Sequence, residues 1–443
     1  MSNLPPVAVL LSFEGPDPYS MVGGLGTRVT ELSAALAEAR VRTTLVFVGD
    51  PARPPVERPS MTLEYRRWCQ WISADYPAGV YDGELAKMAD YTASVPSFVL
   101  QSIVEPAATR GESVLVIAED WQTAPAILEL DALLRQSGMR ERVALTWNAN
   151  NTYGFHTIDW TALAAAARIT TVSRYMKFEL QKMGAPALVI PNGIPERSIR
   201  GAPKKLVKLA LRALGERRPF FVKVARFEED KRWMQAIEAF AGIARRYPDA
   251  TLVVRGGREA YGTAVLDRAR ELGLSLADFS IASRDPEDVL EALCETPAAV
   301  INVRSFLPEE ALLVLYHVAD AVLANSGREP FGLVGLEVMA VGGVPVTGST
   351  GEDYVQPFDN ALVCDTGEAG ELAALLDQLI EDHEWAMEMA AEGEATARRY
   401  VWPKVLEILA RKLDFVLAGT PPAAVASTDP PPRAKLTALP GGR

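Results

Sequence analysis

The chain has 443 residues, 49% of them hydrophobic and 23% charged, a composition typical of a folded protein with two hydrophobic cores. Acidic residues outnumber basic ones, 57 to 45, and the formal net charge of -12 argues against nucleic acid as a partner. Three cysteines without metal-ligand spacing, Cys69, Cys294 and Cys364, predict packing roles in a reducing compartment. Residues 7–11 follow no basic segment, and no apolar run reaches the roughly 20 residues of a membrane helix, so we expect a cytoplasmic protein.

Short apolar runs rich in β-branched residues alternate with longer amphipathic segments along the chain. This alternation predicts parallel strands joined by helices, and the runs fall into two series. The first series of predicted strands comprises residues 7–13, 43–50, 113–120, 142–148, 169–173 and 187–194. The second comprises residues 219–227, 250–257, 298–306, 320–327, 343–349 and 360–366.

The two series predict an α/β protein with two Rossmann-like domains. We expect an N-terminal domain over residues 1–198 and a C-terminal domain over residues 199–400, separated by a charged stretch that starts at Glu196. Residues 401–419 are predicted to form a helix that crosses back to the N-terminal domain, and the Pro- and Ala-rich residues 420–443 to be disordered. Because open α/β sheets bind ligands beyond the carboxyl ends of their strands, the expected site lies in the cleft between the domains.

The most specific motif starts at Arg328 and reads REPFGLVGLEVMAVGGVPV, with Glu329 and Glu337 across a predicted strand-to-helix transition. It resembles the E-x7-E motif of retaining glycosyltransferases. This resemblance implies that Glu329 contacts the transferred sugar and that Glu337 accepts hydrogen bonds from ribose hydroxyls. The backbone amides of residues Phe331, Gly332 and Leu333 would bind a diphosphate at the helix start. The alternative is that both glutamates belong to an ordinary helix face.

A second motif, VARFEEDKRW, follows the first strand of the second series and contains Arg226 and Lys231. At this place the same family has an arginine and a lysine on the donor pyrophosphate. Two fixed cations can neutralise the leaving diphosphate as a metal ion does elsewhere, so neither metal nor cofactor is expected. The alternative is a pair of surface cations. Arg304, which follows the strand around Asn302, is a candidate contact of the nucleotide base.

Three segments of the first series resemble bacterial glycogen and starch synthases. Gly23 and Gly24 lie in a GGLG loop that could close over the diphosphate, although the synthases usually have a lysine where this chain has Met21. Asp120 lies in a segment similar to their HDWxT motif, with Glu119 in place of the histidine.

A further segment, from Thr146, has Asn148 where the synthases have a histidine. We predict sugar or acceptor contacts for Asp120 and Asn148. For His156, a sugar contact and a purely structural role are equally expected. The departures from the synthase motifs put glucan-chain synthesis in doubt and leave sugar transfer intact.

Two weaker features have a structural alternative that we favour. Aromatic residues between 65 and 91 suit pyranose stacking, but helix packing in an insertion is favoured. The basic stretch between Arg197 and Arg218 suits an anionic membrane surface, but a surface helix that opens the second domain is favoured.

Ser173 and Asn192 complete the set of motifs. Together the motifs resemble the family 4 retaining glycosyltransferases of the GT-B fold over almost the whole of residues 7–415. The resemblance implies transfer of a hexose from a UDP-, ADP- or GDP-sugar to a carbohydrate or other hydroxyl acceptor, with retained anomeric configuration. Two rival hypotheses are a disaccharide phosphorylase on the same scaffold and a non-catalytic protein that binds nucleotide-sugars or glycans. The donor base, hexose, acceptor and oligomeric state have no sequence signal.

Overall fold

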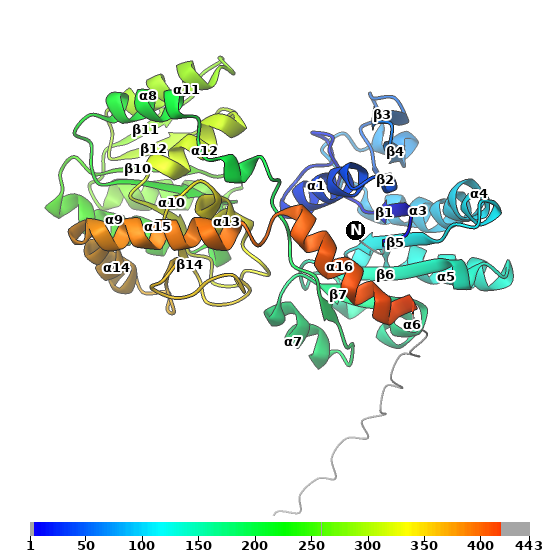
Figure 1. The fold of residues 1–443 in the computed structure, drawn as a ribbon. Helices are drawn as coiled ribbons and strands as arrows, with labels where there is room; N and C mark the ends of the chain where they lie inside the picture. Colours follow the sequence, from blue (N-terminus) through cyan, green and yellow to red (C-terminus); the bar gives the residue numbers. More distant parts are fainter. Residues whose placement is uncertain (1–3, 258, 418–443) are drawn as a thin grey trace, which may run out of the picture.

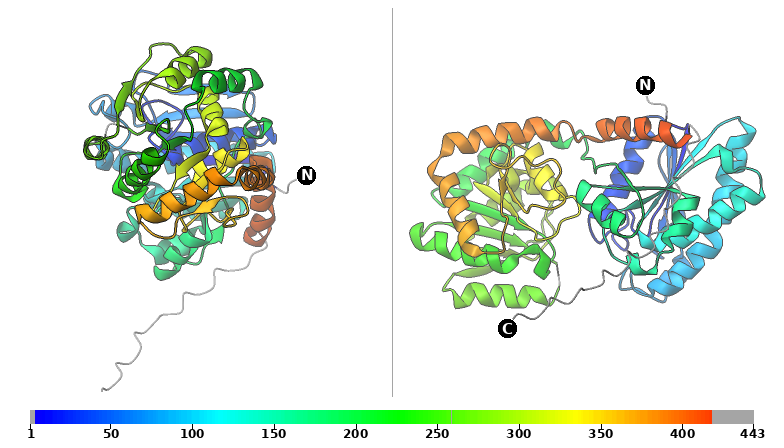
Figure 2. Two further views of the ribbon diagram at one scale, coloured as in Figure 1. Left: turned by 90° about the vertical axis from the view of Figure 1, so that its left-hand side faces the viewer. Right: turned by 90° about the horizontal axis from the view of Figure 1, so that it is seen from below.

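The computed structural model describes residues 4–257 and 259–417, and in it the chain forms two lobes side by side (Figure 1). Each lobe is built on one parallel-dominated sheet that separates two hydrophobic clusters. Helices α15 (His383–Ala397) and α16 (Trp402–Leu417) run one after the other across both lobes (Figure 2).

The N-terminal sheet of the described residues has the strand order β3-β4-β2-β1-β5-β6-β7-β8, and only β3 runs antiparallel to its neighbour. In chain order its strands are β1 (Val7–Leu11), β2 (Arg42–Val48), β3 (Val56–Ser60), β4 (Leu63–Trp68), β5 (Val114–Glu119), β6 (Val143–Ala149), β7 (Arg168–Thr171) and β8 (Leu188–Val189). The helices of this lobe are α1 (Gly24–Glu38), α2 (Gln70–Ser73), α3 (Glu84–Val99), α4 (Glu105–Thr109), α5 (Ala124–Gln136), α6 (Trp160–Ala166) and α7 (Arg174–Lys182).

The C-terminal sheet is parallel throughout its described part, with the order β11-β12-β10-β9-β13-β14-β15. Its strands are β9 (Phe220–Val224), β10 (Thr251–Arg255), β11 (Leu276–Phe279), β12 (Val300–Val303), β13 (Ala321–Ala324), β14 (Pro345–Thr347) and β15 (Leu362–Val363). The helices of this lobe are α8 (Lys204–Leu214), α9 (Trp233–Arg246), α10 (Tyr261–Glu271), α11 (Pro286–Glu295), α12 (Glu309–Val318), α13 (Leu333–Ala340) and α14 (Ala369–Glu381).

Each predicted apolar run contains a strand, because parallel strands buried on both faces need continuous hydrophobic sequence. The structure adds β3, β4 and β11, whose sequences mix polar and apolar residues. The predicted helix packing of the aromatic residues between 65 and 91 is correct for Tyr91, which is buried on α3. It is wrong for Tyr65 and Trp68, which lie on β4, and for Trp71, which is exposed on α2.

Two helices outside the sheets, α8 and α16, were expected from the sequence. The basic stretch folds as α8, which buries Leu206, Ala210 and Leu214 in the second domain, as the surface-helix interpretation predicts. Helix α16 packs on α1 and inserts Trp402 into the cluster beneath the N-terminal sheet, so the end of the described chain is joined to the first lobe. The predicted disordered segment, 420–443, lies outside the described residues.

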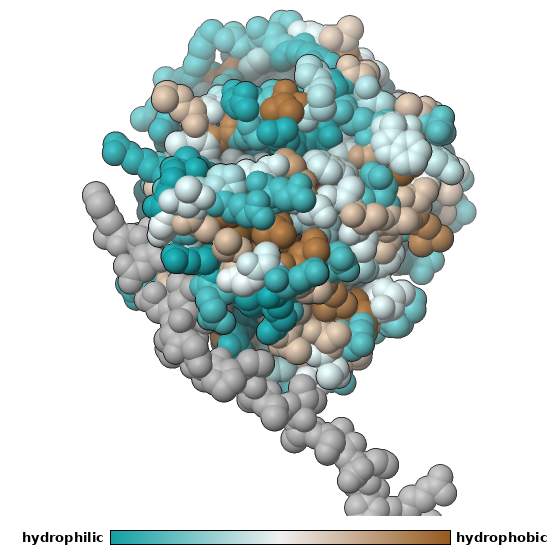
Figure 3. All heavy atoms as spheres, turned by 90° about the vertical axis from the view of Figure 1, so that its right-hand side faces the viewer, coloured by the Kyte–Doolittle hydropathy of each residue, from teal (hydrophilic) through white to brown (hydrophobic). Residues whose placement is uncertain are grey.

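None of the described helices is long and apolar enough to cross a membrane. On the outer face of the N-terminal lobe, hydrophobic residues occur in small groups among hydrophilic ones (Figure 3).

Candidate active site

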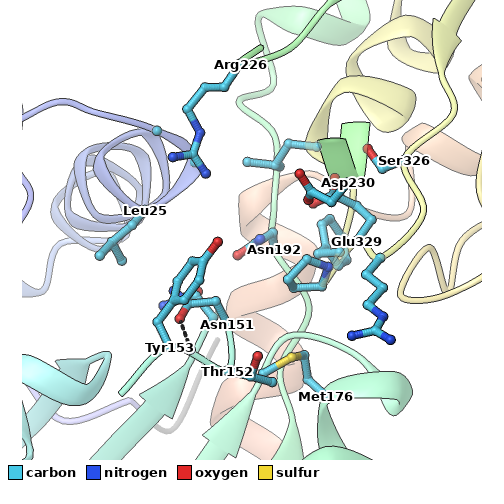
Figure 4. A pocket seen from close by; sticks show the side chains of 18 of the residues that line it. Leu25, Asn151, Thr152, Tyr153, Met176, Asn192, Arg226, Asp230, Ser326 and Glu329 are labelled. Carbon is cyan, nitrogen blue, oxygen red and sulfur yellow. Dashed lines mark hydrogen bonds between the residues drawn. The ribbon is translucent and has the colours of Figure 1, made fainter. Parts of the chain in front are cut away.

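A cavity of about 940 Å³ lies between the two lobes and is lined by both. On the N-terminal side its wall comes from the segments that follow β1 and β4 to β8. On the C-terminal side it comes from β9, β13 and β14 and the segments that follow them. Arg226 and Tyr153 point into this space from opposite lobes (Figure 4). The carboxyl ends of the central strands of both sheets therefore meet at one cavity, where open α/β sheets bind ligands.

Lys231 and Glu329 form an ion pair on the C-terminal wall. The short helical segment Glu229–Lys231 carries the lysine, whose Nζ atom lies 2.9 Å from Oε2 of Glu329 and 3.4 Å from Oδ2 of Asp230. Burial alone would lower the pKa of Lys231, but the charges of Glu329 and Asp230 outweigh it and raise the pKa. The lysine is therefore a fixed cation at the wall of the cavity.

Two arginines extend this cationic region. Arg226 is nearly half exposed, pairs with Glu228 at 2.8 Å and points into the cavity (Figure 4). Arg328 lines the same cavity directly before Glu329. The predicted residues Arg226, Lys231 and Glu329 thus lie on one wall, with one cation more than the motifs indicated.

A buried lysine that the motifs did not single out also lines the cavity. Lys223 lies on β9, and its Nζ donates hydrogen bonds to Oδ1 of Asn325 at 2.6 Å and to the carbonyl oxygen of Leu323 at 3.1 Å. Burial, followed by repulsion from Lys231, lowers the pKa of Lys223 to about 7. The signal in the sequence was a lysine inside an otherwise apolar strand.

The start of α13 also faces the cavity, which is lined by Phe331, Gly332 and Leu333. Gly332 has φ of +79°, and a Cβ there would lie 2.8 Å from Cγ of Glu352, so the turn requires glycine. As this N-cap has no side chain to bond the first helical amides, those amides suit an anion. The side chain of Phe331 is buried against Tyr354 and Tyr400.

Glu352 is a second residue that the sequence did not reveal. It lines the cavity and is 7% exposed; one carboxyl oxygen accepts a hydrogen bond from the amide of Thr350 at 3.1 Å, and the other has no partner. Burial, and then the charge of Glu329, raise its pKa to about 8. The raised pKa favours the protonated form of this carboxyl group.

The glycine loop that contains Gly23 and Gly24 is bonded to a carboxylate of the chain itself. One carboxylate oxygen of Glu14 accepts hydrogen bonds from the amides of Val22, Gly23 and Gly26, at 3.2, 3.1 and 2.9 Å. Gly23 and Gly24 do line the cavity, but a carboxylate of the chain itself occupies the Gly23 amide. A phosphate contact through the Gly23 amide would therefore have to replace this carboxylate, and the donor contact of the loop stays a prediction.

Asp120 is the predicted sugar-contacting residue that the structure places on the N-terminal wall. Its carboxylate accepts hydrogen bonds from the Asn150 amide at 2.7 Å and from Nδ2 of Asn151 at 2.8 Å, and its backbone is left-handed, with φ of +61°. Such strain in a residue other than glycine is typical of functional sites. Burial raises the pKa of Asp120 to about 7, and nearby Glu119 and Glu14 add to the shift.

Four predicted site residues do not line the cavity. Asn148 is fully buried and donates a hydrogen bond to Glu119 at 2.8 Å, so a direct sugar contact is corrected to a supporting role. His156 is exposed outside the cavity, and Arg304 is an exposed partner of Asp278 at 3.4 Å.

Glu337 is the fourth of these residues. It lies on α13, where burial, followed by the charges of Glu309 and Glu31, raises its pKa to about 7. Its ribose contact stays a prediction.

No group of three or more His, Cys, Asp or Glu side chains that could hold a metal ion occurs within residues 4–257 and 259–417. The three cysteines are buried and unpaired.

Comparison with known proteins agrees with this geometry. Residues 210–396 match the family model of group 1 glycosyl transferases. A D-inositol 3-phosphate glycosyltransferase of Corynebacterium urealyticum is 28% identical over 228 residues, which are 49% of this chain and 48% of the relative. The alignment thus spans about half the length of that curated relative.

Solved structures resemble the chain over nearly its whole length. Sucrose-phosphate synthase from Thermosynechococcus elongatus has a TM-score of 0.67 at 18% identity, covering 93% of this chain and 99% of that one. HepE of Anabaena in complex with UDP-glucose has a TM-score of 0.62 at 17% identity, covering 92% and 99%. The expected fold is confirmed: this chain has the two-domain GT-B fold, and its residues 210–396 are similar to the group 1 glycosyl transferases.

Proposed function

We propose that the protein transfers a hexose from a nucleotide-diphosphate sugar to a hydroxyl acceptor with retention of the anomeric configuration and without a metal ion. The observation that carries this proposal is the group of three cations, Arg226, Lys231 and Arg328, around Glu329 and the uncapped start of α13. Cations and helix amides on one wall suit a diphosphate, and the carboxylate between them suits sugar hydroxyls. The HepE structure, with UDP-glucose, is an example of such a donor on this fold.

In the proposed reaction the protein contributes position and electrostatics. The bond between the anomeric carbon and the phosphate oxygen breaks while Lys231 and Arg226 neutralise the negative charge that develops on the leaving diphosphate. Glu329 orients the sugar ring through hydrogen bonds that its carboxylate accepts. The acceptor hydroxyl attacks from the side that the diphosphate leaves, and its proton passes to the departing phosphate oxygen.

A phosphorylase remains the second candidate, because Glu337, the expected ribose contact, does not line the cavity. A phosphorylase uses a sugar phosphate and needs no nucleoside site. A thermal-shift screen separates the two, since a ligand that binds the folded state stabilises it by mass action. We expect stabilisation by at least one of UDP, ADP and GDP; stabilisation by hexose 1-phosphates alone would favour the phosphorylase.

A further inference from the structure

The N-terminal wall of the cavity, where the acceptor of the proposed reaction would bind, has an unusual charge distribution. It comprises the residues of the first lobe that line the cavity, from Glu14 to Asn192. Among these described residues four are acidic, Glu14, Glu84, Asp120 and Glu179, and none is lysine, arginine or histidine. All lysine and arginine side chains that line the cavity come from the other lobe, from β9 and the segments that follow β9 and β13.

Three basic residues of the first lobe that lie close to this wall are already paired. Arg28 is buried and its Nε lies 3.1 Å from Oε1 of Glu119, while Lys182 binds Glu179 at 2.6 Å. Lys87 is buried and donates hydrogen bonds to Tyr19 and to backbone carbonyls. A rotamer change of any of them toward the cavity would break these bonds, so none is poised to bind an incoming anion.

The backbone site that could bind an anion on this wall is also filled. Glu14, only 5% exposed, accepts hydrogen bonds from three amides of the glycine loop, and its other oxygen accepts one from Tyr81 at 2.6 Å. A phosphate at these amides would have to displace a buried carboxylate, which would then lose its partners. The loop thus repels a second anion.

The remaining surface of the wall suits an uncharged sugar or polyol. Trp121 and Tyr153 offer aromatic faces, and the side-chain oxygen of Gln122 is buried and has no hydrogen-bond partner. Asp120 can accept hydrogen bonds from vicinal hydroxyls.

From this distribution we infer that the acceptor is an uncharged, non-phosphorylated polyhydroxyl compound, a free sugar or polyol. The inference rests on the proposed function, because it assigns the N-terminal wall to the acceptor. A phosphate group bound there would meet four carboxyl groups and no cation from its own lobe. Arg226 points into the cavity, but in the proposed donor complex its charge would be shared between the diphosphate and Glu228.

The test compares matched pairs of ligands on the full chain saturated with whichever of UDP, ADP or GDP stabilises it most, so that the cations of the donor wall are occupied. The pairs are glucose with glucose 6-phosphate, fructose with fructose 6-phosphate, and myo-inositol with inositol 3-phosphate. Affinities are measured by calorimetry or ligand-observed NMR. We expect the free member of at least one pair to bind on the order of tenfold tighter than its phosphate.

A charge-reversal variant sharpens the test. Glu84 is partly exposed at the start of α3, and Glu84→Lys places a cation on the wall, so the preference should shift toward the phosphorylated member by roughly tenfold. Glu84→Gln should shift it less. Glu141→Lys, made in the segment that precedes β6 at the opposite end of the strand from the cavity, should not shift it.

Tighter binding of the phosphorylated members by the wild type, or no binding of any free polyol, would overturn the inference. Failure of all three nucleotides to stabilise the protein would instead refute the proposed function.

Discussion

Replacing Lys231 by alanine removes the best-fixed cation of the donor wall. Its side chain is 15% exposed and bonded to Glu329, so it is held in place before any donor arrives. Two unit charges about 4 Å apart interact by about 4 kcal/mol at the effective dielectric constant of a protein surface. If roughly 3 kcal/mol of this is realised in the transition state, turnover falls on the order of a hundredfold or more.

Part of this loss would come from the partner that remains. Without Lys231, the carboxylate of Glu329 stands unpaired beside the donor diphosphate and repels it. The double variant Lys231→Ala/Glu329→Gln separates the two effects, because the amide carries no charge. If the lysine also acts on the diphosphate itself, the double variant recovers at most part of the lost activity; full recovery would show that the lysine serves only to neutralise Glu329.

The assay measures release of nucleoside diphosphate together with the thermal midpoint of each variant. Lys205→Ala is a matched control, because Lys205 is an exposed lysine of α8 on the same lobe and pairs with Glu287 far from the cavity. The control should retain full turnover. Near-normal turnover of the Lys231→Ala protein would refute the assignment of this wall to the leaving group.

Three further changes test other parts of the account. Glu352→Gln should flatten the decline of stability with rising pH. The carboxyl group holds its proton up to about pH 8 in the folded protein but not in the unfolded one, so the free energy of unfolding of the wild type falls by on the order of a few kcal/mol between about pH 5 and 8. Urea unfolding at several pH values measures this fall. Arg28→Met leaves Glu119 buried without its ion pair and should cost roughly 3–5 kcal/mol in the same assay; a loss below 1 kcal/mol would contradict this. Glu337→Gln should raise the donor KM several-fold to about a hundredfold, whereas Glu329→Gln should lower mainly kcat; unchanged nucleotide-sugar binding by Glu337→Gln in calorimetry would remove the ribose role.

The sequence predicts most of the fold because its strands are buried on both faces. Runs such as Val7–Leu11 are apolar at every position, and this pattern does not depend on knowing the neighbours. Strands β3 and β11 are different: β3 is an exposed edge strand and β11 is only partly buried, so their sequences have no continuous hydrophobic signal. β3 pairs with β4, which follows it directly in the chain, and β11 pairs with β12, so these pairings and not a buried apolar run determine their positions.

The sequence predicts those site residues that belong to a local sequence motif. Arg226, Lys231 and Glu329 each follow a strand of the second series, and the topology brings those strand ends together at one cavity. Glu14 and Glu352 were missed because a glutamate gains its meaning from what it contacts, here three loop amides and a buried position beside Glu329. No spacing rule reveals such contacts.

The central claim is that a nucleotide-sugar reacts in the cavity between the lobes without a metal ion. The most direct measurement is release of nucleoside diphosphate from UDP-, ADP- and GDP-hexoses, in the presence of free sugars and polyols and of excess EDTA. We expect one donor to release its diphosphate together with an equal amount of glycosylated acceptor, and EDTA to leave the rate unchanged. Turnover that requires magnesium or manganese, or formation of product only from a hexose 1-phosphate with release of inorganic phosphate, would contradict the account.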